Sequence, residues 1–245
     1  IHAGAKPVIV DIDPLTLNID VSQIEKKITN KTKAIIPVHF AGNPCEMEEI
    51  KLLSKKYNLS IIEDCAHAIE TEYKGLKAGS IGSFGCFSFY VTKNLVTGEG
   101  GMIISKSKRI HNKIKTLSLH GMSHDAWKRF GKGGYKHYKV IEPGFKYNMT
   151  DLQAAIGVHQ LKRIDKNWKK RKLIWKKYKE ELKNLPIILP PDEDNGCKHS
   201  YHLFTIQIDD KKTGLSRDIF LNEMKMRNIG LGVHYQAIPE HPIYR

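Results

Sequence analysis

Cysteine is scarce in this chain of 245 residues. No two cysteines form a CxxC pair, and their spacing does not fit a zinc site, so we expect no metal centre. Isolated thiols of this kind are typical of a reducing compartment. We therefore expect a cytoplasmic protein whose four cysteines are reduced: Cys45, Cys65, Cys86 and Cys197.

Long apolar runs are also lacking. None approaches the ~18 residues that a membrane-spanning helix needs, so we expect no membrane partner. The chain opens at Ile1 without Met and without the charged and apolar regions of a signal peptide. This start is typical of the interior of a folded domain, so we expect a fragment of a longer or processed protein.

Acidic residues are outnumbered, 26 against 40 Lys and Arg, which gives a net charge of +14. A basic chain can bind nucleic acid. Much of the excess lies in residues 162–183, where eleven basic residues accompany three acidic ones. Trp168 and Trp175 fall on the apolar stripe of this segment and not among the lysines. We therefore favour a solvated lysine-rich surface without a nucleic-acid partner, and a basic nucleic-acid-binding protein is the alternative.

The pattern of apolar runs predicts an α/β fold. Short β-branched runs indicate buried strands at 7–13, 32–39 and 59–64, and the residues at 47–57 have the spacing of an amphipathic helix. Strand, helix and strand in this order are typical of βαβ units and a mostly parallel sheet. Further strands are expected at 86–90 and 101–104.

The C-terminal third has a different pattern. Thr150 and Gln153 form a capping box that begins a helix, and its apolar stripe continues to Leu182. Beyond a linker rich in Pro and Asp, we expect a strand, a helix and a strand at 204–208, 216–228 and 231–235. The chain would thus divide into a large domain (1–160), a basic helix with linker (161–195) and a small α+β domain (196–245).

Three residues suggest chemistry that depends on pyridoxal 5′-phosphate (PLP). This cofactor needs a lysine amine, a carboxylate beside its pyridine nitrogen, and donors for its phosphate. Lys93 lies between an aromatic-rich strand and a glycine cluster, Asp64 ends another apolar strand, and Ser88 offers a hydroxyl. From the residues alone, a lysine in a loop is nearly always a surface lysine, Asp64 could cap a helix over residues 65–70, and Ser88 could be a packed strand residue.

Three longer motifs add a resemblance. They are Glu63-Asp-Cys-Ala-His-Ala68, Phe87-Ser-Phe-Tyr-Val-Thr-Lys-Asn-Leu-Val-Thr-Gly-Glu-Gly-Gly101 and Tyr147-Asn-Met-Thr-Asp-Leu-Gln-Ala-Ala-Ile-Gly157. In order and style they resemble the DegT/DnrJ/EryC1/StrS family of PLP-dependent nucleotide-sugar aminotransferases. The resemblance runs from end to end, since residues 37–44 and 232–235 also fit.

The resemblance implies a fold-type I PLP-dependent transferase. It has a large domain with a mostly parallel sheet and part of a small α+β domain, and it forms a homodimer whose sites use both subunits. Lys93 matches the lysine that binds the cofactor covalently and serves as acid and base. Asp64 matches the partner of the pyridine nitrogen, Ser88 a phosphate ligand, and His67 a residue beside the cofactor ring.

The resemblance also implies that one residue reaches the cofactor phosphate from the second subunit. Asn148 matches a residue that reaches the phosphate from the neighbouring subunit, but its surroundings differ from the commoner family form, so Lys146 is an alternative. The family's N-terminal Ser-Gly-Thr phosphate-binding turn and the end of the small domain are missing from this sequence. We therefore expect this polypeptide alone to bind PLP poorly.

The implied function is transfer of an amino group, from glutamate, to a keto-sugar carried on UDP or dTDP. Such aminated sugars are used in cell-surface polysaccharides and glycans. The alternatives on the same fold are a PLP-dependent sugar dehydratase and a catalytically inactive relative. Relatives that abandon transamination tend to replace the lysine, so the presence of Lys93 favours transfer.

Overall fold

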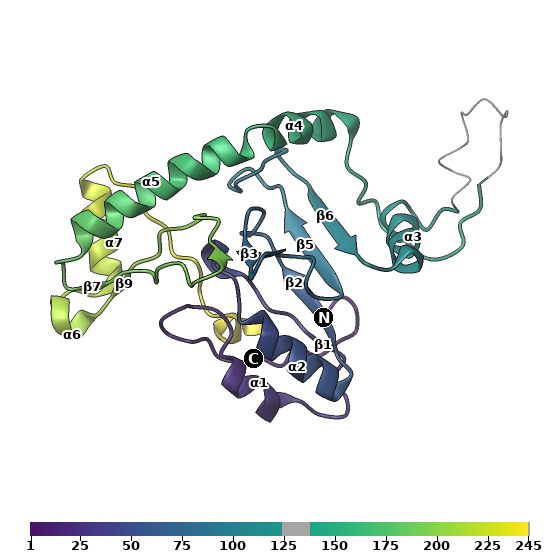
Figure 1. Ribbon diagram of the computed structural model, residues 1–245, viewed down its shortest axis with the longest axis horizontal. Coiled ribbons are helices and arrows are strands. Elements are labelled where there is room, and N and C mark those ends of the chain that lie inside the picture. The colour runs from purple at the N-terminus through teal and green to yellow at the C-terminus, as the bar shows by residue number, and fades with distance from the viewer. Residues whose placement is uncertain (124–137, 245) are drawn as a thin grey trace.

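The computed structural model describes residues 1–123 and 138–244 (Figure 1). Its centre is a four-stranded sheet in the order β1, β2, β5, β6. The strands β1 (Ala34–Ile35), β2 (Ser60–Asp64) and β5 (Phe84–Ser88) are parallel, and β6 (Gly101–Ser105) is antiparallel to β5. The prediction of an α/β fold with a mostly parallel sheet is confirmed.

One side of this sheet is covered by α1 (Val21–Lys27) and α2 (Met47–Tyr57), which lie together in Figure 1. The helix α2 has the predicted bounds. Its first turn is acidic and its last turn basic, as the helix dipole favours, and it ends at Asn58 in the left-handed conformation. Its apolar face enters a core that excludes water: Ile24, Ile35, Cys45, Met47, Ile50, Leu59, Ile61, Tyr73 and Ile81.

A small second sheet links distant parts of the chain. The strands β3 (Glu72–Tyr73) and β4 (Leu76–Lys77) pair antiparallel, and β8 (Cys197–Lys198) pairs with the other edge of β3. The residues that follow β8 pass the 3-10 turn η1 (Phe40–Gly42), where the Ser200 N–H donates to the Gly42 carbonyl. Residues near 200 are thereby fixed beside the carboxyl ends of the central strands.

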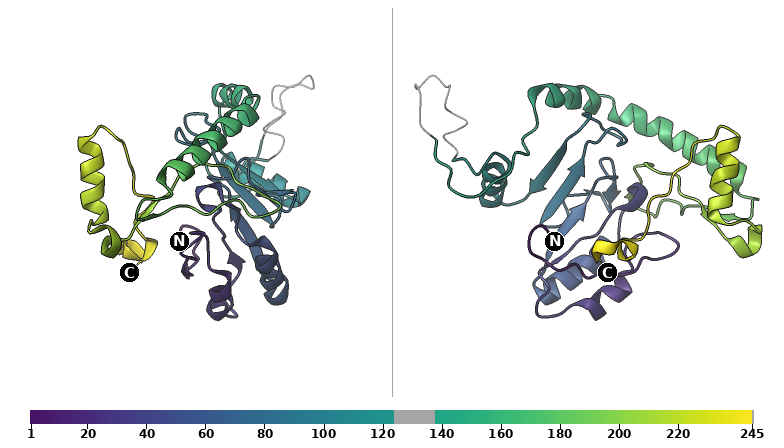
Figure 2. Two further views of the ribbon diagram at one scale, coloured as in Figure 1. Left: turned by 60° about the vertical axis from the view of Figure 1, so that its left-hand side comes forward. Right: turned by 180° about the vertical axis from the view of Figure 1, so that it is seen from behind.

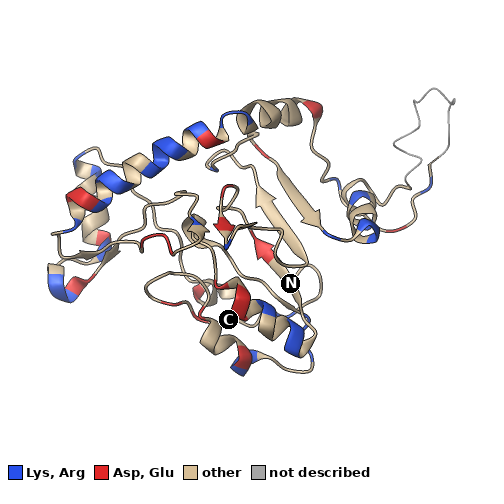
Figure 3. Cartoon of the chain, in the orientation of Figure 1, with Lys and Arg blue, Asp and Glu red and all other residues tan. Residues whose placement is uncertain are grey.

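Three helices follow the central sheet. They are α3 (Lys108–Ser118), α4 (Asp151–Leu161) and α5 (Ile164–Leu182), and Figure 1 shows α4 and α5 end to end along one side. The predicted capping box of Thr150 and Gln153 begins α4. Lys and Arg are spread along α5 in Figure 3. The predicted single apolar stripe is interrupted, because the helix breaks between Leu161 and Ile164.

The inner face of α5 is aromatic. Trp175 is buried against the rings of His199, Tyr201 and Phe204. Trp168 is half-buried and its indole N–H donates to the His199 carbonyl at 2.7 Å. Both tryptophans therefore pack α5 onto the segment after β8, as the interpretation of them as core residues predicted.

The remaining chain forms a smaller unit. The short strands β7 (Ile187–Ile188) and β9 (Gln207–Ile208) pair antiparallel, and α6 (Asp210–Thr213) and α7 (Arg217–Met226) follow. Figure 2 shows α7 standing apart from the central sheet. The 3-10 turns η3 (Ile238–Glu240) and η4 (Pro242–Tyr244) end the described chain. Among the described helices, none combines the length and apolarity needed to cross a bilayer.

Two predicted strands are wrong. Residues 7–13 contribute only the isolated bridge between Ile12 and Ile19, with Val8 and Ile9 exposed, and residues 231–235 form no strand and are exposed. A strand needs a neighbour that accepts and donates its ladder hydrogen bonds. Both segments have the apolar composition of a strand, but within the described residues neither lies beside a strand with which it could form a ladder.

Candidate active site

Two neighbouring strands end at the same edge of the central sheet. In the parallel pair β2 and β5, Asp64 lies opposite Cys86, so Asp64 and Ser88 both come at the carboxyl ends of their strands. This edge is where ligands gather in open parallel sheets. Lys93 lies in the loop that joins β5 to β6, whose ends are held together by the pairing of Ser88 with Gly101.

Backbone hydrogen bonds shape the loop that carries Lys93. The Lys93 N–H donates to the Tyr90 carbonyl at 2.9 Å, and the Thr97 N–H donates to the Phe89 carbonyl at 2.9 Å. The Phe89 N–H in turn donates to the Gly100 carbonyl at 2.8 Å. These bonds turn the chain tightly at the sheet edge, so the lysine is on a fixed loop.

The Lys93 side chain is half-buried. Burial lowers the pKa of its amine, and the nearby Asp64 carboxylate opposes that shift. For Lys93 the loss of hydration is the larger of the two effects, which favours a role at the sheet edge over the interpretation of Lys93 as an ordinary surface residue. A partly desolvated lysine with a lowered pKa has more free amine at neutral pH, which is what covalent catalysis through a Schiff base needs.

Asp64 is fixed by its own turn. Its Oδ1 accepts a hydrogen bond from the Ala66 N–H at 2.9 Å, and its backbone carbonyl accepts one from the His39 N–H at 3.1 Å. Residues 65–70 form turns and not a helix, so the alternative role of Asp64 as a helix cap is wrong. Ser88 is half-buried, and its Oγ accepts a long hydrogen bond of 3.3 Å from the Tyr90 N–H.

His67 is buried, with 7% of its surface exposed. Burial lowers its pKa to about 4, and the charges of Lys93 and His234 act in the same direction. Its Nδ1 accepts a hydrogen bond from the Ala41 N–H at 3.3 Å, which places the ring proton on Nε2. His67 is therefore a neutral ring of defined tautomer within electrostatic range of Lys93.

Asn148 and Lys146 bind each other. The Lys146 Nζ donates to Asn148 Oδ1 at 2.6 Å, and the backbone of Lys146 forms a bridge with Leu119. In residues 1–123 and 138–244, no hydrogen bond or ion pair joins Asn148 to Lys93 or Asp64. The structure therefore brings Lys93, Asp64 and His67 together and leaves the role of Asn148, or of Lys146, as a prediction.

The carboxylate beside Asp64 has a different environment, which sequence analysis missed. Glu63 is fully buried, and its oxygens accept hydrogen bonds from the N–H groups of Gly79, Ile81 and Gly82 at 2.7, 2.8 and 2.6 Å. His39 Nε2 lies 3.1 Å from Glu63 Oε2. Burial alone would raise the pKa of Glu63, but these hydrogen bonds outweigh it and the pKa is lowered.

His39, Glu63 and Cys65 also have the donor types of a metal site, with one ligand atom of each within 4.8 Å of the others. The His39 ring already has a partner at each nitrogen, since Nδ1 accepts from the Cys45 N–H at 3.1 Å. The Glu63 oxygens are bonded as well. The cluster is therefore a hydrogen-bonded support that fixes the turn at 79–82, which leads into β5.

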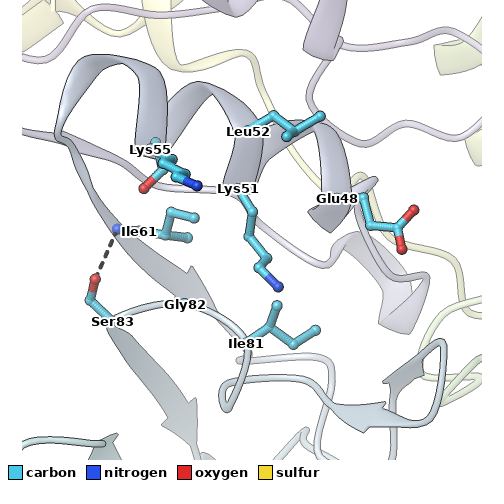
Figure 4. A pocket seen from close by; sticks show the side chains of 9 residues that line it. Glu48, Lys51, Leu52, Lys55, Ile61, Ile81, Gly82 and Ser83 are labelled. Atoms are coloured by element: carbon cyan, nitrogen blue, oxygen red, sulfur yellow. Dashed lines mark hydrogen bonds between the residues drawn. The ribbon is translucent and has the colours of Figure 1, made fainter.

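A hollow of about 580 Å³ lies elsewhere, between α2 and the beginning of β2 (Figure 4). Lys51, Leu52 and Lys55 border it from the helix, and Ile61 and Ser83 from the sheet. It lies at the amino end of β2, whereas Asp64 ends that strand. The hollow is thus separate from the edge that carries Lys93.

The side chains at this edge fit PLP. A lysine amine of lowered pKa, a carboxylate close enough to affect it and a strand-end hydroxyl are groups that this cofactor requires, and the neutral ring of His67 lies near them. Lys93, Asp64, Ser88 and His67 are four of the residues that the sequence predicts for this site, and their roles toward the cofactor stay predictions.

Comparisons with known proteins agree with this geometry. The model of the DegT/DnrJ/EryC1/StrS aminotransferase family matches residues 1–245. Among relatives, the "Uncharacterized protein MJ1066" of Methanocaldococcus jannaschii is 50% identical over 100% of this chain and 64% of its own length. The "Spore coat polysaccharide biosynthesis protein SpsC" of Bacillus subtilis is 45% identical, over 100% of this chain and 63% of its own.

A solved structure is similar as well. The "Putative sugar aminotransferase Spr1654" of Streptococcus pneumoniae, in its PMP-form, has a TM-score of 0.89 and 32% identity, covering 99% of this chain and 66% of its own. The same protein is also solved in a PLP-form. The present chain thus spans slightly less than two thirds of the proteins it resembles, and over that span it belongs to the DegT/DnrJ/EryC1/StrS aminotransferase family.

Proposed function

We propose that the protein is a PLP-dependent aminotransferase that moves an amino group from glutamate to a nucleotide-linked keto-sugar. The observation that carries this proposal is the grouping of Lys93, Asp64 and His67 at one sheet edge, with the pKa of Lys93 lowered by burial. The names of SpsC and Spr1654 support a sugar substrate and a polysaccharide context. Lys93 favours transfer over dehydration.

The cofactor, when bound, supplies the electron sink that makes a proton beside the transferred nitrogen labile. Lys93 is the residue that holds the cofactor covalently and then carries a proton at Nζ. Because burial lowers its pKa, its amine can accept that proton near neutral pH and return it. The backbone hydrogen bonds of the loop hold Lys93 at the sheet edge.

The other residues bind and orient. Asp64 would be the partner of the pyridine nitrogen, and its turn hydrogen bond to Ala66 holds that carboxylate at the strand end. Ser88 offers a hydroxyl to the phosphate. His67 packs as a neutral ring, so it covers one side of the site without adding positive charge. Asn148, or Lys146, would reach the phosphate of a second copy in a homodimer.

The substrate partner in this proposal is a keto-sugar on UDP or dTDP. In this proposal residues 1–160 form the domain that binds the cofactor. Residues 161–195 connect it to residues 196–245, which form part of the small domain. The pairing of β8 with β3 supports contact between residues 196–245 and the cofactor domain.

Incubation of the full protein chain with PLP, glutamate and a panel of UDP- and dTDP-linked keto-sugars tests this function. We expect an aminated sugar from at least one member of the panel. Lys93→Ala should lose that turnover and the cofactor adduct that borohydride fixes, whereas Lys33→Ala, at an exposed position, should keep both. Turnover of amino acids without turnover of any sugar would contradict the substrate class.

A further inference from the structure

Asn94, the residue after Lys93, has all of its side-chain polar atoms in hydrogen bonds. Its Nδ2 donates to Glu70 Oε2 at 3.0 Å and to the Ser200 carbonyl at 3.2 Å. Its Oδ1 lies 2.9 Å from His202 Nδ1. These partners come from two segments far apart in sequence, so the amide joins the Lys93 loop to both.

The partners determine how the amide and the imidazole are oriented. Glu70 and the Ser200 carbonyl accept, so the Asn94 NH₂ group must face them and its oxygen must face His202. His202 therefore carries its proton on Nδ1. Burial lowers the pKa of His202 to about 3, and His67 and Lys93 contribute, so its ring is neutral.

The acid in this network is paired with the long helix. Glu70 is buried, with 3% of its surface exposed, and its Oε1 binds the Arg171 guanidinium of α5. The Arg171 Nε also donates to the Ser200 carbonyl at 3.3 Å. A buried carboxylate keeps its charge only with such a partner. Arg171 thus stabilises the Glu70 carboxylate, which accepts the hydrogen bond from the Asn94 amide.

The same network extends to the ring beside the cofactor edge. The rings of His202 and His67 lie 4.3 Å apart between centroids, tilted by 33°. His67 is itself held by the Ala41 N–H. One continuous set of contacts therefore runs from α5, through Glu70 and Asn94, to the residue after Lys93 and to His67.

We propose that Asn94 is a positioning residue for Lys93, and that the Glu70–Arg171 ion pair orients Asn94 and so couples α5 to the Lys93 loop. The inference rests on the proposed function only in treating Lys93 as the residue that binds PLP. A movement of α5 would then shift the Lys93 loop, because the Asn94 side chain connects that loop to Glu70 and Arg171.

The test measures how fast Lys93 captures PLP in the full-length protein, with borohydride quenching and peptide mass as the readout. No sugar and no amino donor are present. Asn94→Asp replaces the donating NH₂ by an oxygen that faces Glu70 and the Ser200 carbonyl. Asn112→Asp, at an exposed site on α3, adds the same charge elsewhere and is the matched control.

We expect capture by Asn94→Asp to be about tenfold slower at neutral pH, the size of effect seen when a buried hydrogen bond is replaced by an unpaired group. The pH profile of capture should move to higher pH, because a further carboxylate joins Asp64 near the Lys93 amine. Asn112→Asp should match the unmodified protein in rate and profile.

Arg171 supplies a second, independent pair of variants should Asn94→Asp fail to fold. Arg171→Met should slow capture, and Arg171→Lys should recover part of the loss because it keeps the charge beside Glu70. Arg163→Met, at the exposed start of α5, is the control. Equal capture rates and pH profiles in folded Asn94→Asp or Arg171→Met and the unmodified protein would overturn the inference. Absence of capture by Lys93 in the unmodified protein would instead refute the proposed function.

Discussion

Glu63 and Asp64 are adjacent acidic residues at the end of one strand, yet their surroundings differ. Successive side chains of a strand point to opposite faces of the sheet. Glu63 points into the interior, where His39 and three backbone N–H groups satisfy its oxygens. Asp64 is only half-buried and lies near the amine of Lys93. The strand thus supplies one carboxylate for structure and one for chemistry.

The two sides also differ in how closely the backbone packs. Behind Glu63, a side chain at Gly85 would place its Cβ 2.3 Å from the Cα of Gly79, so these two segments approach as only glycines allow. On the Asp64 side the chain leaves the sheet in a loop that exposes Tyr90. A rigid support on one face and an accessible group on the other is the arrangement that precise positioning of a reactive lysine requires.

The largest expected effect is on the accessible side. Lys93→Ala should lower turnover of the full protein about 10²–10⁴-fold, since a positioned acid–base group is lost. Its unfolding midpoint in urea should be unchanged or raised, because the substitution removes a partly desolvated cation. Steady-state rates and urea unfolding measure the two quantities. A lowered midpoint would mean that Lys93 stabilises the fold. The Asp64 side of the strand would then have a structural role as well, like the Glu63 side.

The next effect is on the buried side. Glu63→Ala should lower the free energy of unfolding by about 3–5 kcal/mol, because it leaves the His39 ring and three backbone N–H groups without an acceptor in the interior. Thermal or urea unfolding measures the loss. A cost below about 1 kcal/mol would show that water or relaxation satisfies these groups and that Glu63 does not fix the turn at 79–82.

Asp64→Ala should have a small effect on stability and a large effect on the affinity for PLP. We expect the free energy of unfolding to stay within about 1 kcal/mol of the unmodified protein, since the substitution removes the turn hydrogen bond to Ala66 and a solvent-screened attraction to the Lys93 amine. Affinity for PLP should fall about tenfold or more, as one charge-assisted contact is removed. Equilibrium dialysis with PLP gives the affinity. Affinity equal to that of the unmodified protein would remove Asp64 from the site.

The smallest expected effect is a difference in acid sensitivity. The pKa of Glu63 is lower in the folded chain than in the unfolded one, so its contribution to stability is present above the ordinary carboxyl pKa of about 4.3. That contribution is lost as the pH falls through the lower folded value. Glu63→Gln should therefore lose less stability than the unmodified protein when the pH is lowered from 7 to about 3. Parallel curves for the two proteins would contradict the lowered pKa.

Local patterns predicted the parts of this fold that local forces determine. The helix at 47–57 has its own apolar stripe and end charges, and Thr150 begins α4 with a capping box that lies within four residues of chain. The strand that ends at Asp64 was predicted from its own short run of apolar, β-branched residues, which is also a local pattern. The prediction that Lys93, Ser88 and His67 lie beside it came from the family motifs and not from local patterns.

Contacts between distant residues were not predictable in this way. Arg171 and Glu70 are 101 positions apart, and nothing in the lysine-rich run at 162–183 distinguishes that arginine. The segment at 7–13 has the composition of a strand, and its exposure depends on which neighbours surround it. Whether a residue such as Glu63 is buried likewise depends on the register of β2 against β5, which is a property of the folded sheet.

Peptide mapping after borohydride reduction of the full protein with PLP tests the central claim most directly. We expect one modified lysine, Lys93, whose labelling falls in Asp64→Ala and persists in Asn112→Asp. Modification of a different lysine, or Lys93 labelling that is unaffected by loss of the Asp64 carboxylate, would contradict the assignment of this sheet edge as the cofactor site.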